Sequence, residues 1–164
     1  MRRQIERILD YLDGVAFIWR DVPPDTPWLV DPQAGHIGLL ELEQGQNPPP
    51  YLAHVDFHLV GYAHSPGVTA DQKRLANKID GMLITVTALL WKVHAEAAQL
   101  AKMSDTALLG YQALSLLNDM ETNANDAFVG QSDPATGNVQ GGVTQIHDEL
   151  QRLATMEVSR VTGG

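Results

Sequence analysis

The chain has 164 residues, with 11 Lys and Arg against 20 Asp and Glu, so its formal net charge is −9 at neutral pH. This length predicts a single domain over residues 1–164, and a hydrophobic content of 44% is enough for an ordinary core. The acidic balance argues against direct binding of nucleic acid, because phosphate-backbone binders concentrate Lys and Arg. The absence of cysteine excludes disulfide scaffolds, thiol catalysis and cysteine-bound metal clusters.

The N-terminus has no signal-type apolar stretch, and no apolar run reaches the roughly 20 residues that a membrane span needs. We therefore expect a soluble chain that is not exported and does not bind membranes. The expected location is then the cytoplasm, or a particle that is assembled in the cytoplasm.

Residues 1–69 predict one helix followed by short strands. Apolar residues recur at helical spacing over 2–13, with Glu6 and Asp10 among the charged residues of the outer side. An apolar run with aromatic and β-branched residues predicts a strand over 15–19, and residues 37–43 are predicted as another strand. Residues 28–30, between prolines, are expected to be a further short extended piece. The clearest strand is predicted for 51–62, because apolar and polar residues alternate there.

The remainder of the chain predicts helices. An apolar period of three to four residues favours a long helix over 70–102, although the β-branched residues after Gly81 would equally allow a buried strand. A second helix follows a short connection, so residues 70–129 form a helical hairpin. A glycine-rich loop over 130–142 and a last helix over 143–164 complete the chain. The expected fold class is α+β: a small antiparallel or mixed sheet with an N-terminal helix, packed by two to three longer helices.

One segment is similar to a catalytic motif. Residues 63–67, Ala-His-Ser-Pro-Gly, follow a predicted strand and resemble the nucleophile elbow of α/β-hydrolases. The residue after the serine of that elbow donates its backbone N–H to the oxyanion, and Pro66 has no N–H to donate. We therefore predict no catalytic residue, no cofactor and no enzymatic activity.

A second segment has the residue types of a metal site. His54, Asp56 and His58 lie on the polar face of the predicted strand, and a His-x-Asp pair with a further histidine resembles the facial triad of non-haem iron oxygenases. Histidine and aspartate on such a face also pair across a sheet or face a partner subunit. We favour a polar strand face that pairs across the sheet or faces a partner subunit. The alternative is a small metal-dependent enzyme that uses these three residues.

Charge is uneven along the chain and indicates a contact between copies. Residues 70–102 carry five basic and three acidic residues, whereas residues 103–164 carry two and eight. Lys73, Arg74 and Lys78 are therefore candidates to meet an acidic surface of a neighbouring copy. Trp28, in its proline-bounded segment, is a further interface candidate. A further alternative is that the protein is an adaptor, which binds another protein through the acidic helices after residue 103.

The order of the expected elements resembles a known class of proteins. A helix over 5–12, strands over 15–19, 37–43 and 51–62, and a helix over 69–81 resemble the tail-terminator and tail-completion proteins of tailed bacteriophages. The resemblance covers about half of the chain. It implies a non-enzymatic structural protein of the virion that forms a homo-oligomeric ring and contacts neighbouring tail or connector proteins.

Overall fold

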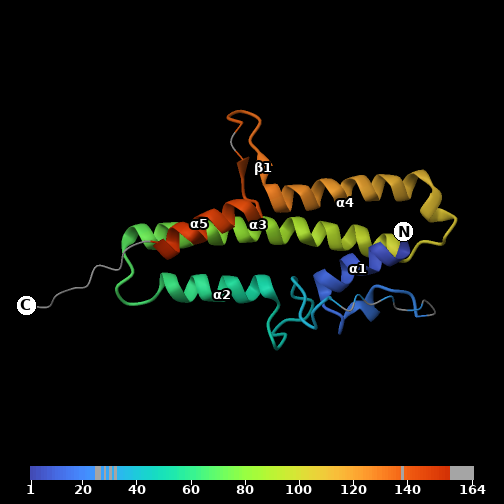
Figure 1. Ribbon diagram of the computed structural model, residues 1–164, viewed down its shortest axis with the longest axis horizontal. Helices are drawn as coiled ribbons and strands as arrows, with labels where there is room; N and C mark the ends of the chain where they lie inside the picture. The colour runs from blue at the N-terminus through green and yellow to red at the C-terminus, as the bar shows by residue number, and fades with distance from the viewer. Residues whose placement is uncertain (25–26, 28, 30, 32, 138, 156–164) are drawn as a thin grey trace, which may run out of the picture.

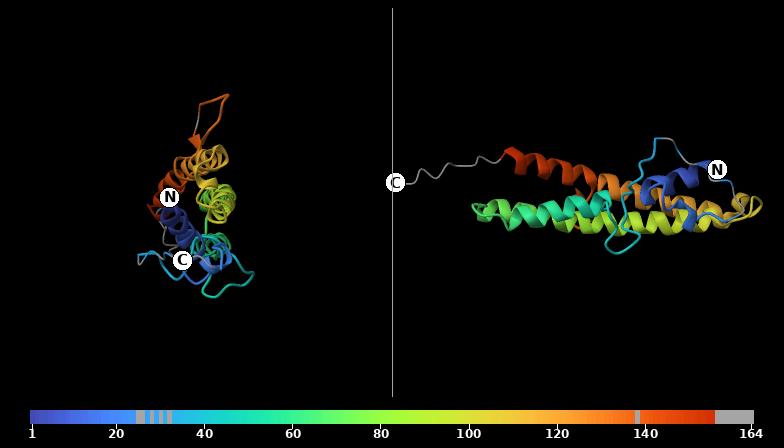
Figure 2. Two further views of the ribbon diagram at one scale, coloured as in Figure 1. Left: turned by 90° about the vertical axis from the view of Figure 1, so that its right-hand side faces the viewer. Right: turned by 90° about the horizontal axis from the view of Figure 1, so that it is seen from below.

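The computed structural model describes residues 1–24, 27, 29, 31, 33–137 and 139–155, and helices hold 64% of them. In chain order the elements are α1 (Arg2–Asp13), the 3-10 helix η1 (Ile18–Arg20), α2 (Tyr51–Ala63), α3 (Ala70–Ala101), the 3-10 helix η2 (Ala107–Leu109), α4 (Tyr111–Val129), β1 (Gln131–Ser132), β2 (Val139–Gln140) and α5 (Val143–Thr155). Figure 1 shows an elongated bundle in which α3 runs between α2 on one side and α4 with α5 on the other. The end-on view in Figure 2 also places α2 and α4 on different sides of α3.

The 32-residue helix α3 is the element on which the others pack. It begins with a capping box, in which Gln72 N donates to Thr69 Oγ1 at 3.3 Å and Thr69 N donates to Gln72 Oε1 at 2.9 Å. The helix continues past Gly81 through its β-branched residues, so the predicted long helix is confirmed. One core cluster joins α1 and α4 to the C-terminal half of α3, and another joins α2 and α5 to its N-terminal half.

The expected α+β fold class is wrong. The described residues contain one pair of two-residue strands, β1 and β2, which pair antiparallel with Gln131 opposite Gln140 and Ser132 opposite Val139. This pair closes the glycine-rich loop predicted over 130–142 and does not form a layer of the core. The helical hairpin is confirmed as α3 and α4, and α5 confirms the start of the last helix, whose predicted residues 156–164 lie outside the described part of the chain.

The clearest expected strand, over 51–62, is the helix α2. Its alternating pattern also contains a helical one, because Leu52, Asp56, Leu59 and Ala63 recur at spacings of four, three and four and form the side that faces α3. A helix satisfies its own backbone hydrogen bonds, whereas a strand at this position would need a neighbouring strand. Leu59 and Ala63 are buried against α3, which decides between the two patterns.

The other expected strands also have a different structure. Residues 15–17 form a turn that leads into η1, which takes up residues 18 and 19, and Phe17 N donates to Gly14 O at 3.0 Å. Within 37–43, Leu39 N and Leu40 N donate to Tyr11 O and Leu12 O at 3.2 and 2.9 Å. The backbone of this segment therefore caps the end of α1 instead of pairing with a strand. The piece predicted over 28–30 includes Trp28 and Val30, which lie outside the described residues.

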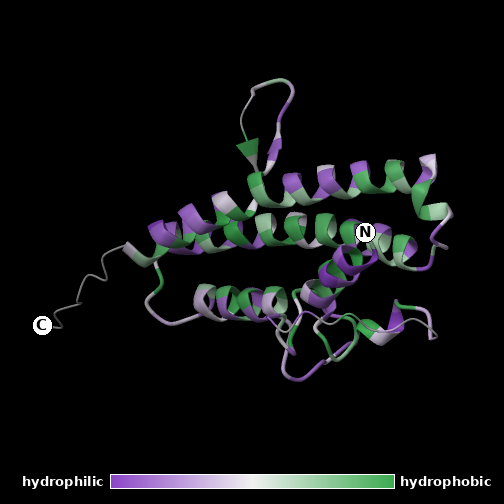
Figure 3. Cartoon of the chain, turned by 45° about the vertical axis from the view of Figure 1, so that its right-hand side comes forward, coloured by the Kyte–Doolittle hydropathy of each residue, from purple (hydrophilic) through white to green (hydrophobic). Residues whose placement is uncertain are grey.

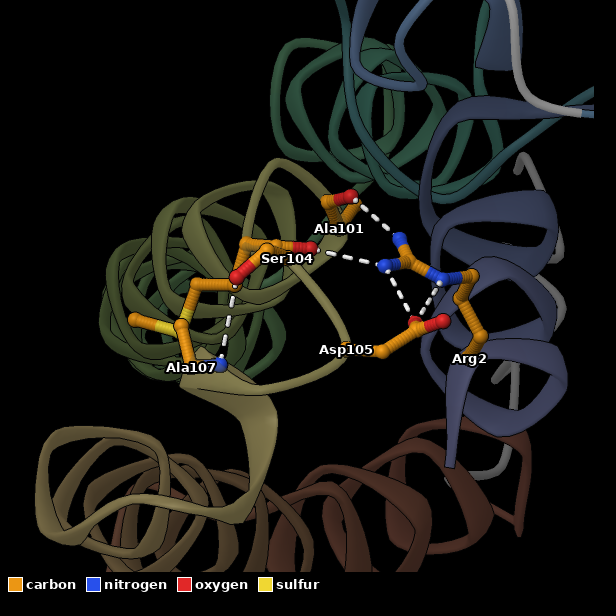
Figure 4. A network of polar contacts seen from close by, with 6 residues as sticks. Arg2, Ala101, Ser104, Asp105 and Ala107 are labelled. Carbon is orange, nitrogen blue, oxygen red and sulfur yellow. Dashed lines mark hydrogen bonds and ion pairs between the residues drawn. The ribbon is translucent and has the colours of Figure 1, made fainter.

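The start of α1 is fixed to the turn that joins α3 and α4 (Figure 4). The Arg2 guanidinium donates to Ala101 O at 3.0 Å and to Met103 O at 2.7 Å, and it pairs with Asp105 Oδ1 at 2.8 Å. These carbonyl groups belong to the C-terminal end of α3, where a cation is favourable. The same turn is closed by Ser104 Oγ, which accepts from Ala107 N at 3.2 Å. Arg2 thus links the start of α1 to the end of α3, beside the core contacts of Ile5, Leu9 and Leu12.

Candidate functional site

A row of buried acids lies along α1. Glu6, Asp10 and Asp13 follow one another at spacings of four and three, so they share one side of the helix, and their exposed fractions are 1%, 0% and 0%. Acidic side chains are almost never fully buried unless they are paired. Glu6 Oε2 accepts from Leu29 N and Asp10 Oδ2 accepts from Asp31 N, both at 2.7 Å. The remaining oxygens of the three carboxylates have no hydrogen-bond partner.

The last of these acids meets a histidine and a second aspartate. His94 Nε2 lies 3.0 Å from Asp13 Oδ1 and 3.2 Å from Asp21 Oδ2. The exposed fractions of the His94 and Asp21 side chains are 13% and 15%. Neither contact places an N–H in line with the carboxylate, so His94 Nε2 and both Asp13 oxygens have no hydrogen-bond partner in spite of these short distances. We call Asp13, Asp21 and His94 the acid–histidine cluster.

Three separate segments hold this cluster together. Asp13 ends α1, and Gly14 follows it with φ of +81°, which turns the chain back over the helix end. A Cβ on Gly38 would lie 2.3 Å from Asp13 C and Leu12 O, so only glycine lets residues 38–40 close over this end. Asp21 follows η1, where the flanking Ile18 and Val22 are buried. The third member, His94, comes from the C-terminal half of α3.

The environment of the cluster shifts its ionisation. Burial raises the pKa of Asp13, and contact with His94 offsets part of this rise. Burial opposes a charge on His94, but the adjacent carboxylates of Asp13 and then Asp21 prevail and raise the pKa of His94. Burial also raises the pKa of Asp10, against the backbone hydrogen bond from Asp31. The cluster therefore attracts a positive charge into a site that is mostly shielded from water.

The structure separates the three residues predicted as an alternative metal site. On α2, His54 and His58 are one turn apart and exposed, with their Nε2 atoms 2.8 Å from each other. Asp56 lies on another side of the helix and faces Asp80 of α3. The hydrogen bond with Asp80, then burial, then the charge of Asp80 raise the pKa of Asp56. The helix thus brings the two histidines together and directs the aspartate elsewhere.

Asp56 and Asp80 line an apolar groove. This groove, of about 490 Å³, lies between α2, α3 and residues 39–41. Its lining side chains are mostly apolar and include Ala53 of α2 and Leu83, Ile84 and Trp91 of α3. Ile84 has an exposed fraction of 64%. We call this feature the α2–α3 groove.

The predicted interface residues have different surroundings. Arg74 pairs with Asp71 on the same helix, and Lys78 Nζ pairs with Glu149 Oε1 of α5 at 2.6 Å. Lys73 is exposed near the start of α3. Trp28 lies outside the described residues. Two of the three predicted cations are therefore already paired within the chain.

Sequence reasoning missed the acid–histidine cluster. It assigned Glu6 and Asp10 to the outer side of the first helix, because charged residues usually face water. One signal was present: three acids at i, i+4 and i+7, directly beside the apolar stripe of Ile5, Leu9 and Leu12. Nothing in the sequence indicated that His94 belongs to this cluster, since only the fold brings α3 beside α1.

Comparison with protein-family models, curated proteins and solved structures gives no match for this chain. Among the helices of the described segments, none combines the length and the apolar composition required to cross a membrane.

Proposed function

We propose that the protein is a non-enzymatic assembly component whose copies join through the α2–α3 groove. The observation that carries this proposal is the character of α2. Apart from the side that carries His54 and His58, this helix is mainly apolar around its circumference, yet among the described elements it packs extensively only against α3. The exposed fractions of Phe57, Tyr51 and Val60 are 73%, 54% and 47%. Large apolar side chains left exposed on a helix indicate a surface that a partner covers.

The partner surface that fits the groove is present on the same chain. At the turn between α3 and α4, Leu109, Tyr111 and Leu114 have exposed fractions of 86%, 85% and 54%. We call these three residues the hairpin tip; Figure 3 shows hydrophobic residues around η2 as well as on α2. A tip inserted into the groove of a second copy covers its own apolar residues together with the exposed Ile84 and Trp91 of the groove. The Tyr111 hydroxyl can also donate a hydrogen bond to the groove carboxylates Asp56 and Asp80.

Apolar side chains, rather than opposite charges, support the same pairing. Helix α4 carries Asp119, Glu121 and Asp126 and no basic residue, and the ionisable residues that line the groove, Glu41, Asp56 and Asp80, are also acidic. The contact therefore depends on burial of the apolar residues of the hairpin tip and of the groove. Because the two contacting surfaces differ, the contact is head-to-tail, and such contacts form a ring when they close and a filament when they do not.

The proposal does not depend on the resemblance to phage tail terminators. The three segments that carried that resemblance as strands are helical or irregular, as described above. A ring remains one of the forms that a head-to-tail contact produces, and a virion location remains a prediction. Binding of a different protein through the same groove is the adaptor alternative.

Blocking each surface separately tests the proposal. We choose Ile84→Glu to place a charge in the groove and Tyr111→Glu to place one on the tip. Each variant alone should be monomeric in analytical ultracentrifugation, since each loses one half of the contact. An equimolar mixture should form heterodimers only, because the intact tip of one variant binds the intact groove of the other.

Matched controls place the same charge elsewhere on the same helices. Gln99→Glu on α3 and Gln112→Glu on α4 change exposed residues and should assemble like the wild type. A wild type that stays monomeric at tens of micromolar would contradict self-assembly. An assembling wild type whose two blocked variants do not pair would show that the contact is symmetric and the head-to-tail arrangement wrong.

A further inference from the structure

Negative charge is concentrated inside the molecule beside α1. Four of the six carboxylate oxygens of Glu6, Asp10 and Asp13 are buried without a hydrogen-bond partner. The nearest arginine of the same helix, Arg7, pairs with Asp31 at 2.5 Å and has a side chain that is 47% exposed. Burying a charge is unfavourable unless a partner compensates it. This part of the structure therefore calls for a further cation.

We infer that Asp13, Asp21 and His94 bind a divalent transition-metal cation. One atom from each residue contributes, and the three atoms all lie within 4.8 Å of one another. Metal–ligand bonds of about 2.0–2.1 Å place neighbouring ligand atoms about 3.0 Å apart in an octahedral shell and about 3.4 Å apart in a tetrahedral one. The distances from His94 Nε2 to the two carboxylates, 3.0 and 3.2 Å, fall within this range.

The directions of the groups favour a metal ion over a proton shared in the cluster. A proton on His94 Nε2 points along one line, and neither aspartate oxygen lies on a line that makes a hydrogen bond. A metal ion instead accepts lone pairs that converge on one point from several directions. Asp13 is the decisive residue, because it is fully buried, directed into the cluster and without a hydrogen-bond partner for either oxygen.

The donor set limits the choice of ion. One imidazole nitrogen and two carboxylate oxygens suit Zn²⁺, Mn²⁺ or Fe²⁺, and the chain has no cysteine to favour softer ions. A divalent ion balances the two aspartates with a neutral His94. Three protein ligands leave at least one coordination position for water.

Such an ion would fasten the N-terminal segment to the bundle. Its ligands come from the end of α1, the residue after η1 and the C-terminal half of α3. The same ion therefore restrains residues 14–20, which connect two of the ligands. Metal binding should appear as a gain in stability of the folded chain, because the unfolded chain does not hold the ligands together.

The exposed pair His54 and His58 is a competing metal site on the same chain. Two histidines one turn apart on a helix can chelate Zn²⁺ without any contribution from the buried cluster. The test therefore uses the variant His54→Ala/His58→Ala as its starting protein. Both side chains are exposed, so this variant should keep the fold.

The experiment is a calorimetric titration of Zn²⁺ into this starting protein after treatment with EDTA. We expect one Zn²⁺ per chain and a rise in Tm of several degrees. Adding Asp21→Asn should weaken Zn²⁺ binding at least tenfold, with unchanged helical circular dichroism. This residue is preferred to Asp13, whose substitution at a fully buried position can prevent folding by itself.

Lys102→Gln supplies a second, independent variant. Lys102 Nζ lies 3.5 Å from Asp21 Oδ1, so it competes with a metal for this carboxylate. Removing the lysine should leave Zn²⁺ affinity unchanged or increase it. Zn²⁺ binding that disappears with His54 and His58, or that survives Asp21→Asn undiminished, would overturn the inference, as would the absence of any binding.

Discussion

Helices α1 and α2 depart from the usual distribution of residues in opposite ways. The first buries three carboxylates, and the second exposes aromatic and aliphatic side chains. Both helices pack against α3, so the difference does not arise from the scaffold. Buried charge requires an opposite charge, and exposed apolar surface requires cover. We therefore infer that each helix lacks a binding partner. The buried carboxylates of α1 are suited to a cation, and the exposed apolar side chains of α2 are suited to a protein surface.

The largest expected effect on the free energy of unfolding is at the end of α1, where the chain closes tightly over the buried carboxylates. Gly38→Ala would place a Cβ 2.3 Å from backbone atoms of Leu12 and Asp13, so the segment that closes over α1 has to move. We expect a loss on the order of 4 kcal/mol in the free energy of unfolding, measured by urea denaturation. As a control, Gly81→Ala, whose Cβ meets nothing within 4 Å, should gain about 0.5–1 kcal/mol. Equal effects at the two glycines would contradict the tight closure.

Truncating one apolar residue on each helix tests the comparison directly. Leu9 of α1 is fully buried, whereas Phe57 of α2 is 73% exposed. In the Tyr111→Glu background, which the proposal makes monomeric, Leu9→Ala should cost about 2–5 kcal/mol. Phe57→Ala should change stability by about 0.5 kcal/mol or less. A large cost at Phe57 in this monomeric background would mean that α2 is already covered within one chain.

The smallest effect concerns Asp56 and Asp80. The hydrogen bond with Asp80 raises the pKa of Asp56 in the folded state, so the folded chain binds protons more readily than the unfolded chain. The pair is thus most favourable below the ordinary aspartate pKa and loses stability as pH rises through the raised value. Asp80→Asn should therefore stabilise the chain at pH 7 by about 0.5 kcal/mol, since these groups are partly exposed, and have little effect near pH 3.5.

Urea denaturation at both pH values, again in the Tyr111→Glu background, measures this difference. Glu121→Gln, an exposed change on α4, is the control for simple loss of negative charge. Destabilisation by Asp80→Asn at pH 7 would show that the pair is not unfavourable when ionised.

The sequence allowed good predictions where one period dominated it. Helices over 2–13 and 70–102 were expected and are present, because their apolar residues follow a single helical spacing. The segment over 51–62 contained both periods, and only the contact of Leu59 and Ala63 with α3 decides between them. Residues 37–43 were expected to be a strand from their local pattern, and the partner of their backbone, the end of α1, could not be foreseen because it lies far from them in the sequence.

The candidate site was less predictable for the same reason. His54, Asp56 and His58 are separated by the helix, whereas Asp13, Asp21 and His94 are brought together by the packing of α1 on α3. The spacing of Asp13, Asp21 and His94 along the chain does not indicate that they lie close together. Local sequence patterns report local structure, and a cluster formed from three distant segments requires the fold.

Native mass spectrometry of the purified chain tests the central claim about α2 most directly, because it counts the subunits in one assembly. The account predicts ions at multiples of the chain mass for the wild type, monomers for Tyr111→Glu, and dimers when Tyr111→Glu is mixed with Ile84→Glu. A wild-type spectrum that contains only monomers at tens of micromolar would contradict the claim that a second copy covers α2.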